Sequence, residues 1–201
     1  MRLLTDFEDY YDKYFRAHVG NLEFRRQLKD NPDKFSALQF LQSIGYSTIK
    51  IGPLANILGN PKIVVFTNPS LHYGAGKVVM PLSSAKMMYS NKPCTEYFET
   101  NMTYKILQIG NECYSLEIEN NGFIENRLVD CSLLGLGSPG CYNGKYPMYS
   151  IDFVRDNEGN MLACDFDCTV KLGHIQGISQ VLTSEKVVEN LYNYLNNRQE
   201  V

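Results

Sequence analysis

Residues 148–172 read MYSIDFVRDNEGNMLACDFDCTVKL, and strand periodicity, a tight turn and acidic residues coincide in this one segment. Apolar residues alternate with polar ones on both sides of the polar centre DNEGN, residues 156–160. Period-two alternation around a glycine-containing turn is typical of a β-hairpin with one apolar face. We therefore predict strands at 149–154 and 161–168, and the rest of the chain is interpreted around this hairpin.

Three aspartates lie in the two predicted strands. Asp165 and Asp167 are two residues apart, so they point to one face of a strand with roughly 7 Å between them. If the loop has four residues, Arg155 pairs with Asn160 and Asp152 joins that face, whereas a register one residue different puts Asp152 on the other side. Converging carboxylates repel one another unless a cation or protons intervene, and such oxygen ligands suit Mg²⁺ or Mn²⁺. A hairpin with one solvated face and incidental acids explains the pattern equally well.

The hairpin resembles the closing hairpin of the ATP-grasp superfamily. In that family a strand ending in an acid, a short polar turn with glycine and a second strand with an acid-x-Asn pattern hold the magnesium ions that bridge the phosphates of ATP. The resemblance implies that Asp152, Asp165 and Asp167 are metal ligands. The chain departs from the family where Asp165-Phe166-Asp167 stands for Glu-x-Asn, and where CTVKLG, residues 168–173, stands for a small-residue and Pro-Gly segment.

The opening segment TDFEDYYD, residues 5–12, is part of a second resemblance. Together with the Ile-Asp-Phe and Asp-Phe-Asp strands of the hairpin, it is similar to a group of short, uncharacterised bacterial and phage-type proteins. This resemblance covers most of the chain and implies no activity. By periodicity alone the opening segment is an amphipathic helix with a solvated acidic face and an aromatic stripe.

A glycine-rich turn precedes a lysine at Gly74-Ala75-Gly76-Lys77. Glycines let the backbone approach an anion and Lys77 can neutralise it, so the turn is a candidate phosphate loop. It lacks the full Walker spacing of glycines, and a hairpin turn that needs positive φ explains both glycines equally well. The ATP-grasp resemblance uses Gly74, Gly76 and Lys77 as nucleotide contacts.

Two further lysines gain a role from the resemblance. A strand such as YKILQIGNECYSLEI, residues 104–118, carries a basic residue that faces the phosphates in ATP-grasp proteins, and Lys105 is the matching position, with Arg127 in reserve. Lys171 lies just after the hairpin, where the family touches its substrate. The alternative for Lys105 is an edge-strand charge that discourages sheet-to-sheet association.

The composition is that of an ordinary globular chain of 201 residues, 44% apolar and 20% charged, with a formal charge of −3. Nucleic acid binding is unsupported, because its usual sign is a basic stripe and a high pI. Since no run of about 18 apolar residues and no charged-then-apolar leader is present, we expect a cytoplasmic protein without membrane spans. Six cysteines without a CxxC pair are expected to be buried, reduced thiols rather than zinc ligands or disulfides.

The remaining elements indicate an α+β fold. We expect an ATP-grasp-like antiparallel sheet lobe with flanking helices, in a minimal or truncated form. It forms one domain over 1–201, with an N-terminal α/β part at 1–66 and a sheet-rich part at 67–201. The expected strands are 46–52, 63–66, 104–110 and 113–119, and the expected helices are 34–43, 83–89 and 185–196, the last capped by Thr183 or Ser184.

Two functions remain open. The resemblance implies an ATP- and Mg-dependent ligase that activates a small-molecule or peptide carboxylate as an acyl phosphate, which an amine or a thiol then attacks. The other is a degenerate, non-catalytic ATP-grasp-like binding protein, for which 14 tyrosines and a mildly acidic surface suit a protein partner. A nucleic-acid-modifying role is a third hypothesis, with no basic patch to recommend it.

Overall fold

The computed structural model describes most of the chain in two compact units. The described residues are 34–54, 57, 61–68, 76–120, 126–135, 148–167, 170, 172 and 175–197. The small-sheet unit comprises the described residues of Pro32–Thr100 and Phe153–Asp165, and the large-sheet unit those of Asn101–Asp152 and Phe166–Val201. The acidic and aromatic opening segment lies outside the described residues.

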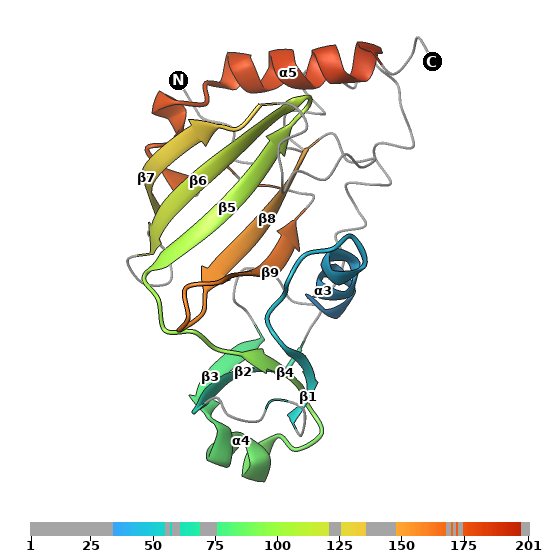
Figure 1. Cartoon of the computed structure of the whole chain (residues 1–201), viewed down its shortest axis with the longest axis vertical. Helices are drawn as coiled ribbons and strands as arrows, with labels where there is room; N and C mark the ends of the chain where they lie inside the picture. Colours follow the sequence, from blue (N-terminus) through green and yellow to red (C-terminus); the bar gives the residue numbers. More distant parts are fainter. Residues whose placement is uncertain are drawn as a thin grey trace. The chain divides into compact units, whose positions relative to one another are not determined.

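The large-sheet unit is built on a six-stranded sheet with the order β10-β7-β6-β5-β8-β9, and Figure 1 labels the strands from β7 to β9 of this order. β5 pairs antiparallel with β6, and β6 pairs antiparallel with β7, whereas the short β10 runs parallel to β7. The tip of the β8–β9 hairpin, Phe153–Asp165, is counted in the small-sheet unit. The strands are β5 Met102–Ile109, β6 Glu112–Asn120, β7 Asn126–Leu133, β8 Met148–Arg155, β9 Met161–Asp167 and β10 Ile175–Gln176.

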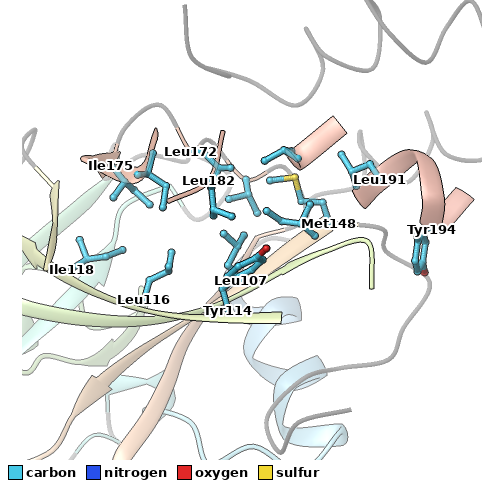
Figure 2. Packing of buried hydrophobic residues seen from close by; sticks show 14 residues of the cluster. Leu107, Tyr114, Leu116, Ile118, Met148, Leu172, Ile175, Leu182, Leu191 and Tyr194 are labelled. Carbon is cyan, nitrogen blue, oxygen red and sulfur yellow. The ribbon is translucent and has the colours of Figure 1, made fainter. Parts of the chain in front are cut away.

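The core of the large-sheet unit lies between the sheet and the C-terminal segment, which includes the 3-10 helix η4 (Ile178–Gln180) and helix α5 (Ser184–Asn197). Figure 2 shows side chains of β5 and β6, such as Leu107 and Leu116, facing those of the C-terminal segment, such as Leu182. The expected cap of α5 is confirmed for Thr183, whose hydroxyl accepts the backbone N–H of Lys186 at 3.3 Å.

The small-sheet unit holds a four-stranded sheet with the order β1-β4-β2-β3 and two helices. The elements are α3 Lys34–Ser43, β1 Ile51–Pro53, β2 Lys62–Phe66, β3 Lys77–Pro81, α4 Leu82–Met88 and β4 Pro93–Glu96. Its apolar cluster includes Ile63 and Val65 of β2 and Ala85 of α4, all fully buried. Phe35 of α3 packs edge-to-face on Phe66, with 5.8 Å between ring centres.

Helix α3 has the bounds that the sequence predicts, and it ends at a glycine in the left-handed region. Gly45 has φ +97°, its N–H donates to the carbonyl of Gln42 at 3.1 Å, and the N–H of Tyr46 donates to the carbonyl of Leu41 at 3.0 Å. These bonds satisfy carbonyls that the helix leaves without intrahelical partners. The expected strand at 46–52 is too long, because pairing with β4 starts only at Ile51.

The predicted α+β class is confirmed, with two antiparallel-rich sheets and flanking helices within the described residues. No helix among these residues is long and apolar enough to cross a membrane. The prediction of reduced cysteines is wrong for Cys113, which is disulfide-bonded, although Cys94, Cys131 and Cys164 are not in disulfides. Periodicity places Cys113 in a buried strand, but it carries no information on a distant thiol.

Candidate functional site

The turn of the β8–β9 hairpin is organised by Asp156. Its carboxylate accepts the backbone N–H groups of Glu158 at 2.9 Å and Asn160 at 2.8 Å, together with the Asn160 side-chain amide at 3.0 Å. These hydrogen bonds favour the ionised carboxylate and hold the pKa of Asp156 below its usual value, and the bond from the Asn160 side chain has the largest effect. Gly159 supplies the positive φ, +90°, that the turn needs.

The loop of this hairpin is one residue shorter than expected. The N–H of Asp156 donates to the carbonyl of Asn160 at 3.0 Å, and the N–H of Gly159 donates to the carbonyl of Asp156 at 3.1 Å. Three residues therefore lie between the closing pair, as in a type I turn followed by a left-handed glycine. Of the two registers left open by the sequence, the four-residue loop that pairs Arg155 with Asn160 is thus not the one that forms, since Asp156 takes that place.

At the base of the hairpin, the aspartates lie on the face opposite to a pair of stacked aromatic rings. Tyr149 of β8 and Phe166 of β9 stack at 5.6 Å, so they share one face of the sheet. Because neighbouring residues of a strand point to opposite faces, Asp152 of β8 and Asp167 of β9 lie on the other face. Asp165 also neighbours Phe166, so within β9 it points to the same face as Asp167. Continued from the closing pair Asp156 and Asn160, the register would put Tyr149 and Phe166 on opposite faces, so their stacking indicates that the alternation shifts by one residue along the hairpin, as at a β-bulge.

Lys105 meets one of these acids. Its ammonium group forms an ion pair with Asp152 and donates to the Ser150 hydroxyl at 3.1 Å. The lysine side chain is 13% exposed and the aspartate side chain 27%. β5 lies between β6 and β8, so the alternative of Lys105 as an edge-strand charge is wrong.

A second lysine binds the hairpin within the small-sheet unit. Lys34, the first residue of α3, lies 2.9 Å from the Asp165 carboxylate, and its side chain is 12% exposed against 39% for the aspartate. The sequence pattern assigns Lys34 only to a helix start. No spacing rule connects it with a strand so far along the chain, so sequence reasoning missed this contact, as it missed Ser150.

The acids fit a magnesium ion by their chemistry. Within the part of the chain that the structure describes, no three His, Cys, Asp or Glu side chains form a group that could hold a metal ion. Mg²⁺, however, is usually bound through one or two carboxylates with water and substrate phosphates completing its shell. Asp152 and Asp167, on one face of neighbouring strands, provide that smaller set of oxygen donors.

The candidate phosphate loop is described only in part. Gly76 has φ +68°, and its carbonyl accepts the Thr67 N–H at 2.9 Å and the Thr67 hydroxyl at 3.0 Å, as at the closure of a hairpin. Lys77 opens β3 opposite Phe66, with its ammonium 5.8 Å from the centre of that ring. Gly74 and Lys171 lie outside the described residues. Lys77 belongs to the small-sheet unit and Lys105 to the large-sheet unit.

Comparison with solved structures shows which known fold this architecture resembles. No protein-family model and no curated protein matches the sequence. The structure is similar to the ATP-grasp ligase PsnB complexed with a phosphomimetic variant of its minimal precursor, Mg and ADP, with a TM-score of 0.57 at 11% identity over 96% of this chain and 75% of that one. The fold is ATP-grasp-like.

Two further solved structures are similar to this chain. The D-alanine–D-alanine ligase from Coxiella burnetii has a TM-score of 0.52 at 10% identity, over 85% of this chain and 59% of its own. The macrocyclase MdnC bound with precursor peptide MdnA, from Microcystis aeruginosa MRC, has a TM-score of 0.51 at 10% identity, over 84% and 62%. The ATP-grasp-like chain thus spans about three fifths of the length of these two proteins. At such identities the similarity establishes the fold alone, and function has to be argued from the site.

Proposed function

We propose that this protein is a cytoplasmic ATP- and Mg-dependent ligase that activates a carboxylate as an acyl phosphate for attack by an amine or a thiol. The observation that carries the proposal is the partly buried Lys105–Asp152 ion pair on neighbouring strands of an ATP-grasp-like sheet. The pair supplies a cation for phosphate oxygens and a carboxylate for a hard metal ion in one place.

The proposed reaction has two steps. A carboxylate oxygen of the substrate attacks the γ-phosphorus of ATP, the bond to the bridging oxygen breaks, and ADP leaves with its electron pair. The amine or thiol then attacks the carbonyl carbon of the acyl phosphate, inorganic phosphate leaves, and the proton of the nucleophile passes to solvent. Because the transferred group needs positioning and charge neutralisation more than covalent help, cationic side chains and metal ligands suffice as machinery.

The residues of the chain have the following proposed parts. Lys105 exchanges Asp152 for phosphate oxygens while it keeps the Ser150 hydroxyl as a neighbour. Asp152 and Asp167 are the proposed ligands for Mg²⁺, which when bound would neutralise phosphate charge, and the resemblance implies Asp165 as a third ligand. Gly74, Gly76 and Lys77 are proposed nucleotide contacts, and Lys171 is a proposed catalytic residue next to the substrate.

A peptide carboxylate is the substrate class that we favour over a free small molecule. Two of the similar structures, PsnB and MdnC, were determined with precursor peptides. Their fold is shared with this chain, which supports a peptide as the donor of the carboxyl group.

One observation favours the second candidate, a non-catalytic ATP-grasp-like binding protein. Asp152 and Asp165 are each paired with a lysine of the chain itself. In a scaffold that has lost its nucleotide, such pairs keep the hairpin acids neutralised without any metal. A protein partner would then be the target of the molecule.

A thermal-shift titration with ATP and ADP, each with and without Mg²⁺, separates the two candidates. Nucleotide at a hundred times its dissociation constant stabilises the folded state by about 2.7 kcal/mol, which is roughly 5–10 °C for a chain of this size. We expect that shift to require Mg²⁺ and to disappear in Asp152→Asn and Asp167→Asn. Glu99→Gln is the matched control, since it removes an acid of an exposed pair with Lys62.

A trapping experiment then tests the chemistry. Wild-type protein with Mg²⁺, ATP and pooled peptide and small-molecule carboxylates is treated with hydroxylamine, which converts acyl phosphates to hydroxamates. ADP release that depends on the carboxylate, together with hydroxamate, supports the ligase. If millimolar nucleotide leaves the unfolding midpoint of the wild type unchanged, the ligase proposal fails and the binding protein takes its place.

A further inference from the structure

Asp165 is held by a lysine that is almost withdrawn from solvent. The ammonium of Lys34 lies 2.9 Å from its carboxylate, and only 12% of the lysine side chain is exposed. Breaking such a pair by removing one partner leaves a charge with little access to water. Separating the pair is therefore costly on the side of Lys34, although the Asp165 side chain is 39% exposed.

A divalent cation on Asp165 would meet that ammonium. Magnesium binds carboxylate oxygen at about 2.1 Å, so an ion on the paired oxygen of Asp165 would lie within about 5 Å of the Lys34 nitrogen. Two cations at this distance repel one another strongly in a partly desolvated site. Binding therefore requires that Lys34 leave its carboxylate.

Asp152 differs from Asp165 in what its lysine can bind instead. Lys105 also donates to Ser150, and in the proposed function the phosphates of ATP replace Asp152 as its anionic partner. Lys34 lies in the small-sheet unit, at the start of a helix, and its ion pair with Asp165 is part of how α3 is fixed there. The acid that ATP frees for a metal is thus Asp152.

We propose that Lys34 is a built-in cation for Asp165, so that this carboxylate is kept out of metal binding and the hairpin binds one divalent cation, through Asp152 and Asp167. The inference rests on the proposed function for the identity of that single site, and it refines the ligand set that the resemblance implies. Lys34 is a positioning residue in this scheme. It sets the number of metal ions without touching substrate.

The test is the number of Mn²⁺ ions bound per chain, measured by equilibrium dialysis of the full chain against Mn²⁺ with ADP and against Mn²⁺ alone. We expect one ion with ADP for the wild type and for Asp165→Asn, two for Lys34→Gln, and one again for Lys34→Gln/Asp165→Asn. Lys62→Gln, which removes a lysine from the exposed pair with Glu99 in the same unit, is the matched control and should behave as the wild type.

The inference is overturned if Lys34→Gln binds no more Mn²⁺ than the wild type, or if Asp165→Asn in the wild-type background loses the ion. Lys34→Met, checked by near-ultraviolet circular dichroism, serves where the glutamine variant does not fold. If instead the proposed function fails, the wild-type protein binds neither ADP nor Mn²⁺, and this result is distinct from the two above. In that case the inference still requires that Lys34→Gln bind one more Mn²⁺ ion than the wild type, and that the double variant Lys34→Gln/Asp165→Asn lose this ion.

Discussion

We expect the substitution Gly110→Ala to displace helix α5 from the six-stranded sheet. Gly110 lies in the β5–β6 turn with φ +58°, and a Cβ atom there would be 2.3 Å from the backbone oxygen of Asn190 and 3.2 Å from Cβ of Tyr194. A backbone oxygen within a helix cannot rotate away as the tip of a side chain can. The helix itself therefore has to move.

The size of the effect follows from these distances. Since real Cβ contacts essentially never fall below 3.0 Å and this one would be 2.3 Å, the backbone oxygen of Asn190 has to move by about 0.7 Å. An inserted methyl in a well-packed core costs about 1–3 kcal/mol, and a left-handed alanine adds about 1 kcal/mol. The total of about 2–4 kcal/mol corresponds to a fall of roughly 5–15 °C in the unfolding midpoint.

Urea unfolding followed by circular dichroism measures this loss, and Gly45→Ala is the matched control. Gly45 also has a positive φ, +97°, but a Cβ there meets nothing within 4 Å. The control therefore reports the cost of the backbone conformation alone, about 1 kcal/mol. If Gly110→Ala loses no more than Gly45→Ala, the close approach of α5 does not constrain the fold, and the packing argument is refuted.

Three other substitutions test the electrostatics. Burial and the neighbouring Glu112 raise the pKa of Tyr114, so stability should fall as the pH rises past about 10, the unfolded value, and urea midpoints of Tyr114→Phe should lack this loss. The lowered pKa of Asp156 contributes stability that is present above its unfolded pKa and lost as the pH falls through the folded one, so Asp156→Asn should flatten the acid limb of the stability curve. Lys105→Met should cost about 1–4 kcal/mol, and Lys105→Met/Asp152→Asn less than the sum of its single variants, because the partners share one partly buried pair.

Local signals carried most of the secondary structure. The alternation in the hairpin predicts a strand one residue shorter than β8 at each end and a strand that starts with β9 and ends one residue after it, and α3 has the predicted bounds. These elements were readable because alternation, capping residues and helix-ending glycines act over a few neighbouring positions. The strand expected at 46–52 failed for the opposite reason, since pairing with β4, and not alternation, decides where β1 starts.

The geometry of the candidate site could not be read in the same way. Register depends on the turn, and a closing bond between Asp156 and Asn160 shifts it by one residue from the four-residue loop. The lysines that bind the hairpin acids are distant in the chain, Lys105 by 47 positions from Asp152 and Lys34 by far more from Asp165. Strand periodicity says which face an acid occupies, but not which cation the fold brings to it.

The two lysine–aspartate pairs also define what separates the proposed enzyme from a scaffold. In both candidates the acids of the resting protein are neutralised by its own side chains, and a scaffold needs nothing beyond these pairs. The two functions differ in whether Lys105 can exchange Asp152 for another anion. An enzyme needs Lys105 to release Asp152 when phosphate arrives, and this release frees a ligand for the metal in the same step, so nucleotide and metal should bind cooperatively. A scaffold has no anion to take the place of Asp152, and the pair then persists whatever Mg²⁺ concentration surrounds it.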